Sequence, residues 1–202
     1  MVLLGVTGGI GMGKSASGEL IAGMGIPWVD ADAIARDVAL PGSEAVTEIV
    51  RTFGPQVVDE TGALRRDRLA ARIFPDPELR RRLEEILHPR ISAVWRRSVE
   101  NWRRQRTPIA AVVIPLLYEK TYESEFSRII CLACTDATQR RRLQERGWSV
   151  NQIRMRNAAQ MPVVDKMARA DFVVWTEGSL GCLRSQWMRI LGRFEPAICS
   201  PA

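Results

Sequence analysis

Short apolar runs bounded by turn residues recur along the chain, and segments with a helical spacing of apolar residues separate them. The runs are continuous and rich in Val and Ile, which is typical of strands buried on both faces of a parallel sheet. Because strands and helices alternate, the pattern predicts an α/β fold of three layers around that sheet. The five predicted strands are Val2–Thr7, Ile26–Val29, Ile109–Ile114, Arg128–Ala133 and Phe172–Trp175.

Residues that favour helix ends mark the helical segments. Asp76-Pro77 is an N-cap and first-turn pair, and Ser149-x-x-Gln152 has the pattern of a capping box. Two basic stretches, about 60–106 and 136–168, hold helices but no long strand, and we interpret them as helical excursions that cover a ligand. The other predicted helices are Lys14–Met24, Ala33–Leu40, one capped by Ser43 and ended by Gly54, one that runs to Leu87, and one that follows Pro89.

Composition indicates a soluble globular protein of one domain, with 202 residues of which 46% are apolar and 26% charged. No apolar run is long enough to span a bilayer, and no signal peptide precedes the first strand, so a cytoplasmic protein is expected. The net charge of +6 comes mostly from arginine. It suits an anionic partner, such as a phosphorylated metabolite or a nucleic acid, or it reflects arginines on solvated helix faces.

The cysteines stand at positions 131, 134, 182 and 199. Only Cys131 and Cys134 are close in sequence, and they lie in or beside an apolar run. No second pair of ligands has suitable spacing for a metal. We therefore expect buried strand cysteines rather than a metal site.

The strongest chemical signal is Gly8-Gly9-Ile10-Gly11-Met12-Gly13-Lys14-Ser15, which fits the pattern G-x-x-x-x-G-K-S/T in full. It follows a predicted strand and precedes a predicted helix, as a phosphate-binding loop must. Glycines let the backbone wrap a phosphate, and the helix N-terminus adds partial positive charge. Lys14 can reach the β- and γ-phosphates, and the Ser15 hydroxyl can ligate Mg²⁺.

A second signal is Asp30-Ala31-Asp32, after the second predicted strand. Ligands of open α/β sheets bind at the carboxyl ends of strands. Residues two apart in an extended chain point to the same side, so both carboxylates can face one site. One can hold Mg²⁺ through water while the other accepts a hydroxyl proton. Alternatively, Asp30 or Asp32 caps the following helix.

Three further motifs each allow two interpretations. Asp59-Glu60-Thr61-Gly62 matches the D-x-x-G of GTPase switches, but no N-K-x-D follows, so a turn is expected. His88, the single histidine, is either a ligand-binding residue or a residue positioned by Pro89 at a junction of two helices. Arg142 and Arg146 are four residues apart on one helix face, which either clamps phosphates or is solvated.

With these motifs in order, the sequence resembles the dephospho-CoA kinase family over nearly its whole length. The resemblance rests on six motifs: the loop Thr7–Ser15, Asp30-Ala31-Asp32-x-Ile34-Ala35-Arg36, Leu87-His88-Pro89-x-Ile91, Pro115-Leu116-Leu117-Tyr118-Glu119, Gln139-x-x-Arg142-x-x-x-Arg146 with Ala159-Gln160, and Lys166 ahead of Ala170–Val174. It departs from the family where Thr176-Glu177-Gly178 replaces an Asn-x-Gly on the adenine side, and where Ala16 replaces a threonine.

The resemblance implies a three-layer P-loop kinase fold in a single domain over 1–202. About 60–106 would bind substrate, and about 136–168 would form a lid. It implies ATP-dependent phosphorylation of the ribose 3′-hydroxyl of dephospho-CoA, with Mg²⁺ as cofactor. The expected partners are ATP and dephospho-CoA, without nucleic acid or membrane, and the expected state is a monomer.

The implied site residues fall into four sets. Asp32 and Lys14 are catalytic, with Asp32 as the base. Ser15 and Asp30 hold the metal, although the residues alone leave open which aspartate does so. The substrate residues are Asp32, Leu87, His88 and Pro89, and the ATP-binding residues are Gly8, Gly9, Gly11, Met12, Gly13, Lys14, Ser15, Ala16, Arg142 and Arg146. Without the resemblance, another small-molecule kinase or a nucleic-acid-stimulated ATPase would also fit.

Overall fold

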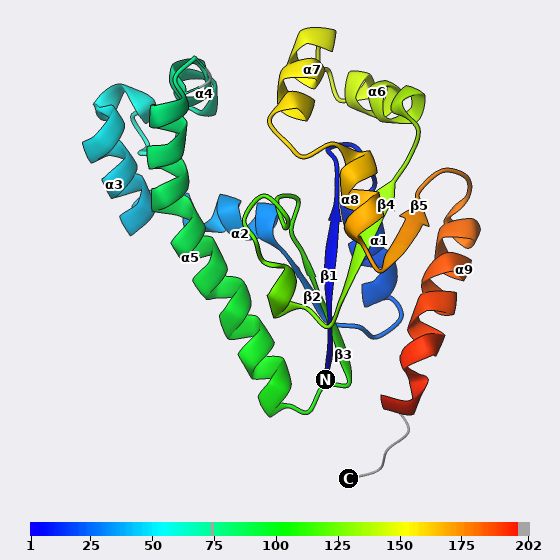
Figure 1. Cartoon of the computed structure of the whole chain (residues 1–202). Coiled ribbons are helices and arrows are strands. Elements are labelled where there is room, and N and C mark those ends of the chain that lie inside the picture. The colour runs from blue at the N-terminus through cyan, green and yellow to red at the C-terminus, as the bar shows by residue number, and fades with distance from the viewer. Residues whose placement is uncertain (74, 198–202) are drawn as a thin grey trace. The chain divides into compact units, whose positions relative to one another are not determined.

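The computed structural model describes residues 1–73 and 75–197 and contains one five-stranded parallel sheet (Figure 1). The strand order is β2-β3-β1-β4-β5. The fold class and all five predicted strands are confirmed, with end shifts of one or two residues. The strands are β1 (Val2–Gly8), β2 (Trp28–Asp30), β3 (Ile109–Val113), β4 (Arg128–Ala133) and β5 (Phe172–Trp175).

The register brings the carboxyl ends of the strands to one edge of the sheet. Val6 pairs with Val113, which in turn pairs with Asp30 on the other side. Gly8, the last residue of β1, pairs with Leu132 of β4. β1 is central and almost fully buried, because both of its faces are covered by helices. The loop that follows Gly8 therefore starts at the middle of this edge.

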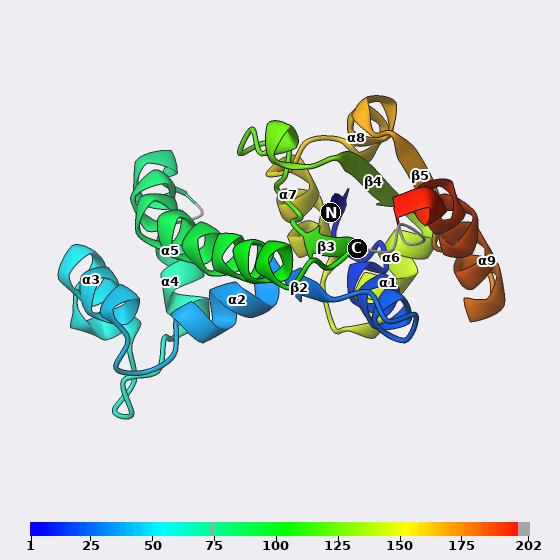
Figure 2. The same cartoon turned by 90° about the horizontal axis from the view of Figure 1, so that it is seen from below.

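Contact density divides the chain into two compact units, residues 1–30 with 99–202 and residues 31–98. We call them the nucleotide unit and the helical unit. In the nucleotide unit, α1 and α9 lie on one side of the sheet and α8 on the other, as Figure 2 shows. Its helices are α1 (Lys14–Ala22), α6 (Asp136–Glu145), α7 (Val150–Ala158), α8 (Val163–Arg169) and α9 (Leu180–Leu191). Short 3₁₀ turns lie at Glu123–Glu125 and Gly192–Ala197.

The helical unit holds α2 (Ala31–Val38), α3 (Glu44–Phe53), a 3₁₀ turn at Pro55–Val57, α4 (Arg66–Ile73) and most of α5 (Pro77–Arg104). It has its own small core, made by one face of α3 and the sides of α4 and α5 that meet it: Ala45, Ile49, Phe53, Val57, Leu69, Leu83 and Ile86. The helical unit begins at Ala31, well before the stretch 60–106 that the basic charge indicated.

The predicted helix caps of the helical unit are confirmed. The Ser43 side chain accepts a hydrogen bond from the Val46 N–H at 3.2 Å, and Gly54 ends α3 with a φ of 86°. Asp76 Oδ1 accepts from the N–H groups of Glu78 and Leu79 ahead of the first turn of α5. In the nucleotide unit, Ser149 and Gln152 form the predicted capping box. Local side-chain chemistry therefore decided these boundaries.

The prediction of two helices joined at Pro89 is wrong, because α5 runs unbroken through Pro89. Proline removes one backbone donor and crowds the carbonyl four residues earlier, but helical bonds on both sides continue. The Arg90 guanidinium donates to the Ile86 carbonyl at 2.6 Å, and the Ser92 hydroxyl donates to the Pro89 carbonyl at 3.0 Å. These two side chains therefore bond backbone carbonyls in the helical turns on either side of Pro89, which has no N–H of its own.

The prediction that Asp30 and Asp32 point to one side of an extended chain is also wrong. Asp30 ends β2, but α2 begins at Ala31, so Asp32 already lies in the first helical turn. A helix turns by about 100° per residue, so the alternation of a strand does not apply between them. The exposed Asp32 carboxylate is instead placed at the positive end of the α2 dipole.

The strand cysteines are buried as expected, since Cys131 and Cys134 keep 0% and 4% of their exposure. Burial raises the pKa of the Cys131 thiol to about 11, which leaves it protonated and unreactive at neutral pH. Cys182 is exposed on α9, and Cys199 lies outside the described residues. Within 1–73 and 75–197, no helix combines the length and the apolar character that crossing a bilayer requires.

Candidate active site

The phosphate-binding loop, Gly8 to Ser15, joins the end of β1 to the start of α1. Gly8 has a φ of 145°, and a Cβ there would lie 2.4 Å from the Leu132 carbonyl oxygen, so only glycine fits. Gly13 precedes α1 with a φ of 75°. The Met12 side chain is buried at 2% exposure, so this residue offers a ligand only its backbone.

Side chains hold the carbonyl groups of four consecutive loop residues. The Lys14 ammonium donates to the carbonyls of Gly8 and Gly9, at 3.0 and 2.7 Å. Gln139 Nε2 donates to the Ile10 carbonyl at 2.8 Å. Arg142 Nη1 reaches the carbonyl of the next residue, Gly11, at 3.4 Å. The loop is therefore braced from within by Lys14 and from outside by helix α6.

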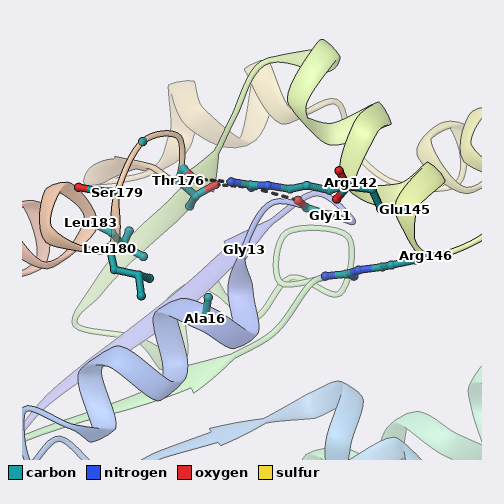
Figure 3. A pocket seen from close by; sticks show the side chains of 11 residues that line it. Gly11, Gly13, Ala16, Arg142, Glu145, Arg146, Thr176, Ser179, Leu180 and Leu183 are labelled. Atoms are coloured by element: carbon teal, nitrogen blue, oxygen red, sulfur yellow. Dashed lines mark hydrogen bonds between the residues drawn. The ribbon is translucent and has the colours of Figure 1, made fainter.

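A cavity of about 370 Å³ lies beside this loop (Figure 3). Three segments of the nucleotide unit line it: the loop with the start of α1, the C-terminal half of α6, and the turn from β5 into α9. In Figure 3 the guanidinium groups of Arg142, on α6, and of Arg146, the residue that follows α6, both extend toward the loop side. The lining residues are Gly11, Gly13, Ala16, Arg142, Glu145, Arg146, Thr176, Gly178, Ser179, Leu180 and Leu183.

The turn after β5 forms hydrogen bonds with Arg142 of α6 and with Thr135, the N-cap residue of α6. Arg142 donates to the Thr176 hydroxyl at 3.0 Å and to the Thr176 carbonyl at 2.5 Å. Glu177 accepts from the Thr135 N–H at 2.9 Å and from the Thr135 hydroxyl at 2.5 Å. These bonds, first those of the Thr135 and Thr138 side chains, lower the Glu177 pKa to about 2. The departure Thr176-Glu177-Gly178 is thus part of the cavity wall and its support.

A buried ion pair lies where β3 ends, close to the base of the loop. Lys166 of α8 is fully buried, and its ammonium lies 2.8 Å from Glu119 Oε1 and 2.6 Å from the Pro115 carbonyl. The Thr7 hydroxyl, just before the loop, donates to the same Pro115 carbonyl at 3.2 Å. Glu119 Oε1 also accepts from the Met161 N–H at 2.8 Å. The ion pair therefore ties α8 and the chain before it to the sheet edge that carries the loop.

Ser15 and Asp30, the two predicted metal residues, both belong to the nucleotide unit. Ser15 is exposed in the first turn of α1. Asp30 ends β2, two strands away from β1, and a strand spacing of about 4.8 Å places it roughly 10 Å from Val6 across the sheet. Hydroxyl and carboxylate oxygens suit Mg²⁺, which keeps several waters and binds through few protein ligands. This donor set fits a magnesium ion carried by phosphates.

The predicted substrate residues belong to the helical unit. Asp32 is exposed in α2, and Leu87, His88 and Pro89 follow one another within α5. Leu87 is partly buried and packs against the core of the helical unit. His88 keeps 27% side-chain exposure, and its Nε2 lies 3.9 Å from Glu84 Oε2.

The turn expected at Asp59 is confirmed. Asp59 Oδ1 accepts from the N–H groups of Thr61 and Ala63, and Gly62 has a φ of 78°. These hydrogen bonds, led by the one from the Thr61 side chain, hold the Asp59 pKa below its usual value. This segment is a side-chain-capped turn, as its composition indicates.

Three functional positions received no role from the sequence: Gln139, Glu119 and Lys166. Each stands in a motif quoted above, but its partner lies far along the chain, 129 residues away for Gln139 and Ile10. Glu177 was noted only as a departure from the family. The available signal was a lysine among the apolar residues of Val163–Arg169, since lysine is almost never fully buried unless it is paired.

A parallel α/β sheet, with a complete phosphate loop at the end of its central strand and an arginine-lined cavity beside that loop, defines a P-loop kinase. Comparison with known proteins narrows this class. A family model described as dephospho-CoA kinase matches residues 2–181, and the chain belongs to that family.

Individual relatives agree with this assignment. The chain is 42% identical over 192 residues to a dephospho-CoA kinase of Anaeromyxobacter dehalogenans, covering 95% of this chain and 91% of that one. It is 41% identical over 186 residues to a dephospho-CoA kinase of Chromobacterium violaceum, covering 91% and 90%. Among solved structures, TT1252 from Thermus thermophilus matches with a TM-score of 0.80 and 33% identity, covering 95% and 97%. The dephospho-CoA kinase from Campylobacter jejuni shares the fold, with a TM-score of 0.63, 21% identity and coverage of 95% and 96%.

Proposed function

We propose that the chain catalyses the ATP-dependent phosphorylation of the ribose 3′-hydroxyl of dephospho-CoA, giving coenzyme A and ADP, the last step of coenzyme A biosynthesis. The observation that carries this proposal is the complete loop with Lys14 and Ser15, in a chain that is 42% identical to a dephospho-CoA kinase over 95% of its length. Membership of the family supports the acceptor, and the loop supports the phosphoryl donor.

The triphosphate of ATP binds along Gly8–Ser15 with Lys14 on its β- and γ-phosphates. Its base and ribose enter the cavity beside the loop, where Arg142 and Arg146 supply planar cations and Leu180 and Leu183 supply apolar surface. Arginine suits this place because its guanidinium binds phosphoryl oxygens in pairs and stacks on aromatic rings. The cavity is of the size of small-molecule sites, which measure about 300–1,000 Å³.

Ser15 and Asp30 would hold Mg²⁺ in this proposal, Ser15 directly and Asp30 through water. Bound there, the ion would neutralise charge that develops on the phosphate oxygens. Asp32 orients the acceptor hydroxyl and takes its proton late, since phosphoryl transfer needs little covalent help from the protein. His88 and Pro89 in α5 contact the acceptor in the same proposal, which extends to a cytoplasmic monomer that acts on small molecules and not on nucleic acid.

Residues 136–168 are proposed to close over ATP and exclude water from the transferring phosphoryl group. Arg142 of α6 and Arg146, the residue after α6, provide the cations of this lid. The bond of Gln139 to the Ile10 carbonyl and that of Lys166 to the Pro115 carbonyl fix its two ends. Amide hydrogen exchange in 136–168 should slow when both substrates bind, because closure protects these amides from solvent. Unchanged exchange there would contradict a lid.

The deciding experiment is steady-state kinetics of Asp32→Asn and Asp30→Asn across Mg²⁺ concentration. Asn keeps the shape of Asp but is not a base, so Asp32→Asn should lower kcat by roughly two or more orders of magnitude at every Mg²⁺ concentration. Asp30→Asn should instead raise the Mg²⁺ requirement. If excess Mg²⁺ rescues Asp32→Asn and not Asp30→Asn, the two roles are exchanged.

The acceptor is tested in the same assay by ADP release from the unaltered protein. Dephospho-CoA should stimulate release, whereas adenosine, shikimate, DNA and RNA should not. Stimulation by one of these alternatives, without a response to dephospho-CoA, would overturn the proposed function.

A further inference from the structure

Helix α6 reaches the phosphate loop through an amide side chain that the proposed chemistry does not use. Gln139 keeps only 5% of its exposure, and its Nε2 donates to the Ile10 carbonyl at 2.8 Å. The same amide lies against Gly9, where a Cβ would come within 3.3 Å of Nε2. A buried side chain in this position acts on the loop backbone, because its donor ends on a loop carbonyl.

We propose that Gln139 is a positioning residue of the phosphate loop, which holds the Ile10–Gly11 peptide in its phosphate-binding orientation and couples it to helix α7. The proposal rests on the proposed nucleotide site. In a planar trans peptide the C=O and the N–H point to opposite sides. Because Gln139 holds the Ile10 C=O on its own side, the Gly11 N–H points away from α6. A loop binds phosphate through such inward N–H groups, so fixing the C=O fixes a phosphate donor.

The conformational preference of Gly11 alone cannot fix the orientation of the Ile10–Gly11 peptide. Its φ is 70°, in the region that glycine enters as readily as the ordinary one, so the peptide before it can turn at little cost. An outside hydrogen bond removes that freedom before ATP arrives. A preorganised donor costs no reorganisation at the moment of reaction.

Gln139 is also hydrogen-bonded to helix α7. Gln139 Nε2 also lies 3.3 Å from Asn157 Oδ1, and Asn157 Nδ2 donates back to Gln139 Oε1 at 3.1 Å. The two amides therefore form a reciprocal pair, which fixes the Gln139 side chain in one orientation. Through it, the position of α7 acts on the orientation of the loop peptide.

The test replaces Gln139 by Glu, which keeps the shape and the acceptor for Asn157 but removes the amide donors. Gln144→Glu is the matched control, because Gln144 is an exposed residue of the same helix and the charge change is the same. The measurements are the dissociation constant of ATP without acceptor, the KM for ATP, kcat and the melting temperature. Asn157→Ala removes only the link to α7 and leaves the contact with Ile10.

Gln139→Glu should weaken ATP binding and raise its KM by roughly 5–30-fold relative to Gln144→Glu, the worth of one or two buried hydrogen bonds. Asn157→Ala should weaken binding by roughly 2–5-fold, since only the orienting partner is lost. If Gln139→Glu does not fold, Gln139→Asn, whose amide falls short of the Ile10 carbonyl, must show the same loss.

Two results overturn the inference. One is an ATP dissociation constant of Gln139→Glu, or of Gln139→Asn in its place, equal to that of Gln144→Glu. The other is a lowered melting temperature with unchanged KM, which marks a purely structural role. If the unaltered protein does not bind ATP, the proposed function itself fails, so the two failures are distinguishable.

Discussion

The cations around the phosphate loop and those on the exposed face of α5 are held differently. In the nucleotide unit, Lys14, Arg142 and Lys166 each donate to backbone carbonyls inside the protein. In the helical unit most arginines are exposed, as Arg81 and Arg82 are at 58% and 55% of their side-chain surface. Arg81 and Arg82 pair with Glu78, a neighbour on the same helix.

The difference shows what a net charge of +6 means for this protein. A cation that leaves water needs a partner in the fold, whereas an exposed cation needs only solvent. The three inward cations of the nucleotide unit therefore have defined geometry, and two of them, Lys14 and Arg142, lie at the proposed ATP site. Charge counts along the sequence do not separate the two kinds.

We expect the largest effect at the buried ion pair of Lys166 and Glu119. Lys166→Met should lower the free energy of unfolding by about 3–5 kcal/mol, because it leaves the Glu119 carboxylate partly buried without its cation. Denaturant unfolding measures this loss. Glu78→Gln on the exposed face of α5 is the control, and it should leave stability nearly unchanged.

The double substitution Lys166→Met with Glu119→Gln sharpens this result. It removes both charges, so it should recover a large part of the lost stability. A loss below about 1 kcal/mol for Lys166→Met alone would mean that the pair behaves as a surface pair, and the contrast between inward and exposed cations would disappear.

A second substitution tests the function of an inward cation rather than its stability. Lys14→Ala should lower turnover by about 100-fold or more, the loss expected when a donor to developing phosphate charge is removed. ATP binding should also weaken, while the melting temperature should stay close to that of the unaltered protein. A variant that retains most of its turnover would refute the assignment of the phosphate loop.

The smallest expected effect is a difference in salt dependence between two carboxylates that have the same low pKa. Glu78 and Glu177 both have a pKa of about 2, but hydrogen bonds from the charged Arg81 and Arg82 cause the first shift and hydrogen bonds from the neutral Thr135 and Thr138 cause the second. Salt screens the attraction between exposed opposite charges more than a hydrogen bond from a neutral hydroxyl. NMR titration at low and high salt should therefore show the Glu78 pKa rising with salt and the Glu177 pKa staying near 2.

Both groups have a folded-state pKa below the ordinary value of 4.5. Their contribution to stability is present above pH 4.5 and is lost as the pH falls toward 2. Equal salt responses of the two resonances would contradict the different causes assigned here.

Much of the fold follows from rules that act between near neighbours in the chain. Apolar runs predicted the five strands, of which β1, β3 and β4 are buried as expected and the edge strands β2 and β5 are only partly buried. Ser43, Asp76 and Ser149 predicted helix starts through bonds to residues two or three positions ahead. The phosphate loop is of the same kind, since its glycine spacing is set by the backbone of eight consecutive residues. The sequence alone therefore determined the class of protein and the place of its phosphate site.

Tertiary structure decided what required a partner from elsewhere. Nothing near Pro89 in the sequence indicated that α5 would continue through it. The helix predicted from Ala33 begins two residues earlier, at Ala31, and so separates Asp32 from Asp30. Gln139 bonds a carbonyl 129 residues away, and Lys166 bonds one that is 51 residues away. Such contacts depend on how β4, α6 and α8 pack around β1, because a buried donor binds whichever acceptor the packing brings within reach.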